Sequence, residues 1–285
     1  MGSKSYAHLS ATEDPTWLKF SLIGITLCIL TIIVIAPTLL VFYEALRNGF
    51  GPFLKTFADP YTQHAIQMTF WVALLAVPIN TAFGICLAWT ATRYTFPGKK
   101  ILLALIDLPI SVSPVIAGLI FVLLYGLHGW FGPWLMEHHI RIIFAFPGIL
   151  LATLFVTLPY VARTLIPLMQ AQGQAEEEAA LTLGANGWQI FWHITLPKIR
   201  WGLLFAIILC NARTMGEFGA VSVVSGHIRG ITNTIPLHIE ILHHEYHTSS
   251  AFALASLLAA LAIATLIVKS IAETLSLRQQ NSSST

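Results

Sequence analysis

The chain has 285 residues, of which 56% are hydrophobic and only 10% are charged. Soluble domains carry about a quarter charged residues, so this composition excludes an ordinary soluble protein and favours a membrane protein. The formal net charge of +2 is small, and we attribute it to membrane topology rather than to nucleic-acid binding.

Six apolar stretches are each long enough to cross a bilayer as a helix. They are Leu18–Tyr43, Ile66–Thr90, Ile101–Gly126, Ile142–Ala162, Gly202–Val224 and Ala251–Ile271. The predicted fold class is therefore all-α, with six transmembrane helices. The chain divides into a tail (1–17), a first helix with an outer loop (18–65), a transmembrane core (66–271) and a second tail (272–285).

The Lys and Arg residues indicate how these helices are oriented, because they collect on the side that is not translocated. With the N-terminus inside, ten of them fall in the cytoplasm: Lys4, Lys19, Arg93, Lys99, Lys100, Arg163, Lys198, Arg200, Lys269 and Arg278. Four fall outside: Arg47, Lys55, Arg141 and Arg229. We predict that both termini and the loop 163–200 are cytoplasmic.

The loop 163–200 is predicted to begin with a helix over Gln170–Leu183. Small side chains recur on one stripe of this helix, at Ala175, Ala179 and Thr182. They would let another surface approach closely. Gly184 is expected to end the helix, because glycine readily adopts the left-handed conformation that closes a helix and turns the chain.

A second short helix is predicted after this turn. Asn186 is a suitable cap, and Gln189 three residues later completes a capping-box-like pair. The face of this helix carries Trp188, Phe191, Trp192 and Thr195. Pro197 is expected to end it. An aromatic face at the cytoplasmic side needs a partner or the membrane interface.

The same loop carries a spaced signature. It reads Glu178-Ala179-Ala180, three residues, Gly184, nine residues, Ile194, one residue, then Leu196 and Pro197. At these positions the chain resembles the permease subunits of bacterial ATP-binding cassette (ABC) importers. The resemblance implies the type I importer permease fold, with these residues coupling the chain to a separate ATPase subunit. The alternative is a hairpin that packs only against its own bundle, with Glu176–Glu178 as a solvated face.

This chain carries no recognisable site for ATP. A phosphate-binding loop needs a glycine, four residues, then Gly-Lys-Ser/Thr, whereas Gly98-Lys99 is followed by Lys100. We also find no catalytic carboxylate pair and no Ser/His/Asp arrangement. The sequence therefore predicts a subunit that is not an enzyme, with no cofactor and no metal site of its own.

The fifth apolar stretch carries charges at bilayer depth, which cost roughly 2.5–3.5 kcal/mol each on insertion scales. Arg213 and Glu217 lie four residues apart and could neutralise each other on one helix face. Alternatively, Arg213 lines the translocation path for an anion, with Glu217 orienting it. Gly216 and Gly219 would then allow close helix packing or a gate hinge.

Two weaker candidates lie elsewhere. Asp107, near Pro109, is expected to satisfy backbone groups freed by the neighbouring prolines. The outer segment Asn233–Tyr246 is predicted to form an interfacial helix that begins at Pro236. His243 and His247 follow at helical spacing, which is only a weak indication of metal binding.

The residues from Arg213 to Ala220 resemble the sulfate and molybdate branch of the importer family, and Ser222–Glu240 is similar to the CysW-type subunits of sulfate/thiosulfate permeases. The resemblance covers roughly Ile66–Ser270. It implies a bacterial inner-membrane complex in contact with membrane lipid. Its other members would be a CysT/CysU-type permease, two copies of an ATPase and a periplasmic sulfate-binding protein. A permease for molybdate, tungstate or another oxyanion, a secondary transporter and a non-transporting scaffold remain alternatives.

Overall fold

Helices make up the regular structure of residues 16–283, which are the residues that the computed structural model describes, with side chains placed as far as residue 271. Five helical segments are long and apolar enough to cross a bilayer, and one bent pair makes a sixth. In order they are α1 (Thr16–Leu30) with η1 (Thr31–Ile35) and α2 (Ala36–Leu46), α4 (Pro60–Arg93), α5 (Lys99–Ser111) with α6 (Pro114–Tyr125), α8 (Phe146–Gln172), α10 (Gly187–Ile190) with η2 (Phe191–Thr195) and α11 (Leu196–Met215), and α14 (Thr248–Ser283). The prediction of an all-α protein with six spans is confirmed.

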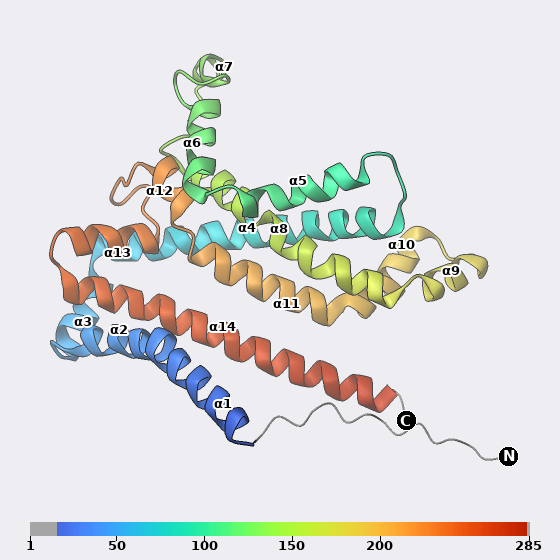
Figure 1. Cartoon of the computed structure of the whole chain (residues 1–285). Helices are drawn as coiled ribbons and strands as arrows, with labels where there is room; N and C mark the ends of the chain where they lie inside the picture. Colours follow the sequence, from blue (N-terminus) through green and yellow to red (C-terminus); the bar gives the residue numbers. More distant parts are fainter. Residues whose placement is uncertain (1–15, 284–285) are drawn as a thin grey trace.

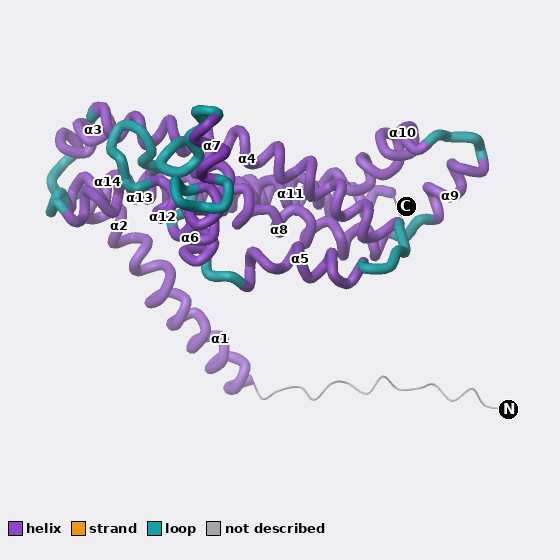
Figure 2. The backbone as a smooth tube through the Cα atoms, turned by 90° about the horizontal axis from the view of Figure 1, so that it is seen from above, coloured by secondary structure: helices purple, strands orange, loops and turns teal. Residues whose placement is uncertain are grey.

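Shorter helices lie at the two ends of this bundle. They are α3 (Phe50–Ala58), α7 (Gly132–Glu137), α9 (Ala175–Thr182), α12 (Gly219–Ser225) and α13 (Ile235–His244). Figures 1 and 2 show α9 and α10 at one end of the bundle, and α3, α12 and α13 at the opposite end. The last turns of α14 lie toward the end that carries α9 and α10 (Figure 1).

The core lies where α8 packs against both α4 and α11. Small residues allow this close approach, since a side chain at Gly84 in α4 would meet Val161 in α8 at 2.6 Å. Toward the end that carries α9 and α10, Ala88 of α4, Leu165 of α8 and Ile199 of α11 form one buried cluster. These three helices therefore connect the two ends of the protein.

The first span lies at the edge of the bundle. Figure 2 shows α1 leaving the other helices at an angle, and none of its side chains is buried. A helix that is apolar on every side and uncovered by protein faces lipid. Residues 1–15 of the predicted N-terminal tail lie outside the described residues, whereas Thr16 and Trp17 already belong to α1.

The predicted third span is not one straight helix. α5 and α6 meet at an angle of 106°. Ser113 has an extended backbone (ψ 133°) immediately before Pro114, as expected because the proline ring disfavours a helical conformation in the residue that precedes it. The prediction of an unbroken helix over Ile101–Gly126 is therefore wrong.

Two other predicted boundaries are also wrong. The span expected over Gly202–Val224 ends as a helix at Met215 and resumes at Gly219. The polar loop expected over 163–200 is shorter, because α8 continues to Gln172 and α11 begins at Leu196. Gly173, at φ +68°, interrupts the helix expected over Gln170–Leu183, since this conformation cannot continue a right-handed helix.

Candidate functional site

The segment from α9 to η2 forms a tight helical hairpin, as the sequence predicts. Gly184 has φ +86°, the left-handed conformation that a turn requires. Asn186 Oδ1 accepts a hydrogen bond from Gln189 N at 2.8 Å, and Gln189 Oε1 accepts one from Asn186 N at 2.9 Å. The predicted capping box is therefore confirmed, and it fixes where the second helix of the hairpin begins.

The outer surface of the hairpin is apolar and uncovered by this chain. Its small stripe is exposed along its length, at Ala175, Ala179 and Thr182. Large side chains surround this stripe: Leu181, Leu183, Trp188 and Trp192 are 57%, 87%, 70% and 48% exposed. This set of seven residues, here called the docking face, lies beyond the end of the bundle and suits a protein partner.

The signature residues divide between this surface and the hairpin interior. Glu178, Ala179, Gly184 and Pro197 are exposed, whereas Ala180 is buried and Ile194 and Leu196 are half-buried. The prediction that Pro197 ends the helix is wrong, since one continuous helical segment runs from Gly187 to Met215. The wider turn of η2 just before the proline accommodates it, with Leu196 N bonding to Phe191 O five residues back.

Glu177 is a site residue that the sequence analysis missed. Its side chain is 10% exposed and its Oε1 lies 2.6 Å from Arg93 Nη2, at the end of α4. Thr195 Oγ1 donates a hydrogen bond to the same oxygen at 2.7 Å. The acidic run Glu176–Glu178 is therefore not simply a solvated face. Glu177 shares the inner side of α9 with Ala180 at i, i+3, a periodicity that the sequence does contain.

At the opposite end of α11 the structure brings Arg213 and Glu217 together. Arg213 Nη1 lies 2.7 Å from Glu217 Oε2, and the two side chains are 30% and 1% exposed. The pairing is as predicted, but Glu217 lies beyond the end of the helix rather than on its face. Its Oε1 accepts a hydrogen bond from Ala220 N at 3.1 Å, so the carboxylate also caps the start of α12.

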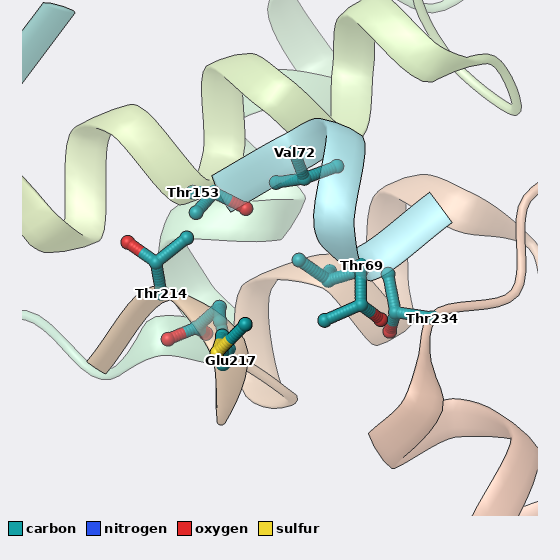
Figure 3. Close-up of a pocket in the computed structure, with 8 residues that line it drawn as sticks. Thr69, Val72, Thr153, Thr214, Glu217 and Thr234 are labelled. Atoms are coloured by element: carbon teal, nitrogen blue, oxygen red, sulfur yellow. The ribbon is translucent and has the colours of Figure 1, made fainter. Parts of the chain in front are cut away.

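A small cavity of about 10 Å³ lies beside Glu217 (Figure 3). Its lining is Thr69, Val72, Thr153, Thr214, Met215, Glu217, Val221 and Thr234. In Figure 3, Thr214 and Thr153 lie near Glu217, whereas Thr69 lies beside Thr234 on the other side of the cavity. The hydroxyls of Thr214 and Thr234 are buried and have no hydrogen-bond partner among the described residues. A space of this size, with two unpartnered hydroxyls on its lining, has room for a single water molecule.

The two glycines near Arg213 differ in their surroundings. A side chain at Gly219 would meet Pro114 of α6 at 2.8 Å, so this glycine permits close packing of α12 on α6, as predicted. Gly216 ends α11 and lines a larger apolar groove of about 280 Å³ between α11 and α14. The neighbours of Arg213 in sequence line these two spaces, Thr214 the small cavity and Ala212 the apolar groove.

Asp107 has a different partner from the one expected. Its Oδ1 lies 2.6 Å from Arg163 Nε, with the two side chains 43% and 53% exposed. The prediction that it satisfies backbone groups near the prolines is therefore wrong. A long arginine on the adjacent α8 reaches the carboxylate, and this partner is 56 residues away in sequence.

The end of the bundle opposite the hairpin carries a group of ionisable side chains. α13 begins with Pro236 in its first turn, as predicted. His227 pairs with Glu240 at 3.0 Å, and Arg229 pairs with Glu245 and thereby lowers the pKa of Glu245. Burial lowers the pKa of His238. Within the described residues, no three His, Cys, Asp or Glu side chains come close enough to hold a metal ion.

Comparisons with known proteins agree with this geometry. Residues 80–278 match the family described as "Binding-protein-dependent transport system inner membrane component". The sulfate transport system permease protein CysW of Escherichia coli (strain K12) is 51% identical over 254 residues, which are 89% of this chain and 87% of that protein. The permease protein CysT of the same organism is 33% identical over 238 residues, or 84% and 86% of the two chains. A crystal structure of a bacterial alginate ABC transporter, with its alginate-bound periplasmic protein, matches at a TM-score of 0.72 and 18% identity over 92% of this chain and 94% of that chain.

Proposed function

Because this chain belongs to the family of inner-membrane components of binding-protein-dependent transport systems, we propose that it is the CysW-type permease of an importer for sulfate or thiosulfate. The chain is a transport subunit of the membrane and not an enzyme, and it has the predicted fold of an ABC importer permease. Energy for transport comes from a separate ATPase subunit in this proposal.

The observation that carries the proposal is the docking face of the hairpin. Leu183 and Trp188 are 87% and 70% exposed beyond the end of the bundle, beside the exposed signature residues Glu178 and Ala179. Large apolar side chains exposed outside the membrane need a partner. In this proposal a cleft in the ATPase covers them, and the hairpin and both termini lie in the cytoplasm.

The remaining partners follow from the same family. The chain shares more identity with CysW than with CysT, so a CysT-type permease is the expected second half of the membrane unit. Two ATPase copies would serve the two hairpins of such a pair. A periplasmic sulfate-binding protein would meet the opposite end, where α13 and the pairs of His227 and Arg229 lie.

The anion path is proposed to pass Arg213. Its side chain is 30% exposed at the break between α11 and α12, so the guanidinium can meet an anion while Glu217 holds it from the buried side. A break in a helix is also a place where small movements change access. In this proposal the segment that moves begins at Gly216 and ends at Gly219.

The test is uptake of radioactive sulfate into vesicles that contain the complete complex. Uptake should require ATP on the side of the vesicle membrane where the hairpin lies. It should also require the sulfate-binding protein on the opposite side. An unlabelled excess of thiosulfate, molybdate or tungstate then defines which anions share the path. Uptake that continues without ATP and follows a proton or sodium gradient would refute the proposal in favour of a secondary transporter.

A further inference from the structure

A buried polar contact joins three segments at the base of the hairpin. Arg93 is the last residue of α4, Glu177 lies in the first turn of α9, and Thr195 is the last residue of η2. One carboxylate oxygen, Glu177 Oε1, is 2.6 Å from Arg93 Nη2 and 2.7 Å from Thr195 Oγ1. These three residues are here called the clasp, and none of them belongs to the spaced signature.

Arg93 binds the hairpin at more than one point. Its second terminal nitrogen, Nη1, donates a hydrogen bond at 3.3 Å to the carbonyl of Gly173, where the chain leaves α8. Its guanidinium also lies 5.8 Å from the ring of Trp89, which in turn packs edge-on against Phe191 at 5.7 Å. A planar arginine fork can satisfy two acceptors and an aromatic ring together, which a lysine cannot do.

Few apolar side chains of the hairpin are fully buried. The buried residues of α9 are Glu177 and Ala180, and those of α10 and η2 are Ile190 and Thr195. Only two of these four are apolar, and one of them is an alanine. The orientation of the hairpin relative to α4 and α11 therefore depends on the polar contacts, because buried charges tolerate little displacement from their partners.

We propose that the clasp is a positioning element for coupling, which holds α9 at a fixed orientation to α4 and α11. A force applied to the docking face then moves both long helices together instead of bending the hairpin. This inference rests on the proposed function, since it assumes that an ATPase acts on the hairpin. Arg93, Glu177 and Thr195 act through the helices and do not touch the transported anion.

Neighbouring glutamates provide a matched control. Glu177→Ala and Glu176→Ala remove the same charge from adjacent positions of α9, but Glu176 is 65% exposed where it pairs with Lys198, whereas Glu177 is buried. Exposed pairs contribute little. Thr195→Val is a milder second variant, because it removes one hydrogen bond to Glu177 at almost unchanged volume.

The experiment measures sulfate uptake and ATP hydrolysis by the reconstituted complex at equal amounts of assembled protein. We expect Glu177→Ala to retain ATP hydrolysis and to lose roughly tenfold in sulfate moved per ATP, within the range of coupling energies that single residues carry. Thr195→Val should show a smaller loss, and Glu176→Ala should match the unaltered protein. If Glu177→Ala does not assemble, the amount of sulfate moved per ATP hydrolysed by Thr195→Val decides the question. An unchanged ratio in the assembled clasp variants would overturn the inference.

A second readout separates this inference from the proposed function. Amide hydrogen exchange over residues 175–190 of the complex should be faster in Thr195→Val and Glu177→Ala than in Glu176→Ala, because the hairpin is then less firmly held. Equal exchange rates in all three variants would overturn the inference that the clasp holds the hairpin. An unaltered complex that shows no ATP-driven sulfate uptake would instead refute the proposed function, and the exchange result would still test the clasp.

Discussion

Replacing Arg213 and Glu217, singly and together, distinguishes a structural ion pair from an arginine that serves the anion path. The guanidinium is 2.7 Å from a carboxylate that is 1% exposed, while Arg213 itself is 30% exposed. Glu217 also accepts a hydrogen bond from Ala220 N. This asymmetry gives the three variants different expected stabilities.

Arg213→Met leaves a buried carboxylate without its cation, which costs roughly 3–5 kcal/mol of unfolding free energy. Glu217→Gln costs less, roughly 1–3 kcal/mol of unfolding free energy, because the amide still accepts from Ala220 N and the partly exposed Arg213 side chain keeps some contact with water. The double variant contains no unpaired buried charge. It should be more stable than Arg213→Met alone by about 1 kcal/mol or more, since contacting residues couple by roughly 0.5–3 kcal/mol.

Thermal unfolding of the purified complex and sulfate uptake per inserted complex should be measured for these variants and for Arg213→Lys. We expect the double variant to assemble and not to transport, because the path loses its attraction for an anion. Arg213→Lys should retain part of the uptake, since it keeps the charge and loses the planar fork. Near-normal uptake by the double variant would refute the path-lining role. Equal instability of the double variant and Arg213→Met would refute the pairing.

The other predictions concern the turn, the topology and one buried histidine. Gly184→Val should lower the free energy of unfolding by about 1 kcal/mol or more, because a β-branched residue is strained at φ +86°. The same change should abolish coupled uptake in a correctly inserted complex, and normal uptake would contradict this. With the native cysteines replaced, an impermeant thiol reagent outside intact cells should label a cysteine at Tyr246, which is 91% exposed, and not one at Leu183; the reverse pattern would invert the topology. Burial lowers the pKa of His238 below 6.5, so the unfolded chain binds the proton first and the free energy of unfolding should fall as the pH drops from about 6.5 through the folded-state pKa. His238→Gln should flatten this dependence of the melting temperature on pH, and an unchanged slope would show that other groups cause it.

Features with a local cause were predictable from the sequence. The turn at Gly184 and the cap formed by Asn186 and Gln189 depend on residues within one helical turn of each other, and both occur as expected. The six spans follow from apolar length alone. The bend before Pro114 was missed because apolar length does not distinguish a straight helix from a broken one, although the proline itself is a breaking signal.

Features that join distant parts of the chain were not predictable in the same way. Arg93 and Glu177 are 84 residues apart in sequence, and Asp107 and Arg163 are 56 apart. Nothing in the local pattern of one partner identifies the other. Periodicity does place Glu177 on the buried side of α9, but its cation becomes evident only when the end of α4 is located.

The continuous helical segment from Gly187 to Met215 connects the two sites. It has 29 residues and so is about 43 Å long at 1.5 Å per residue. Thr195 of the clasp lies near its start, and Arg213 lies two residues before its end. A tightly packed helix transmits displacement along its axis, whereas the break at Gly216 allows the chain beyond it to respond differently.

A movement of the hairpin would therefore reach the contact between Arg213 and Glu217. Glu217 is also the residue that caps α12. On this argument, loss of the clasp and loss of the Arg213 pair impair the same step, so combining Thr195→Val with Glu217→Gln should lower uptake less than the product of the two separate effects.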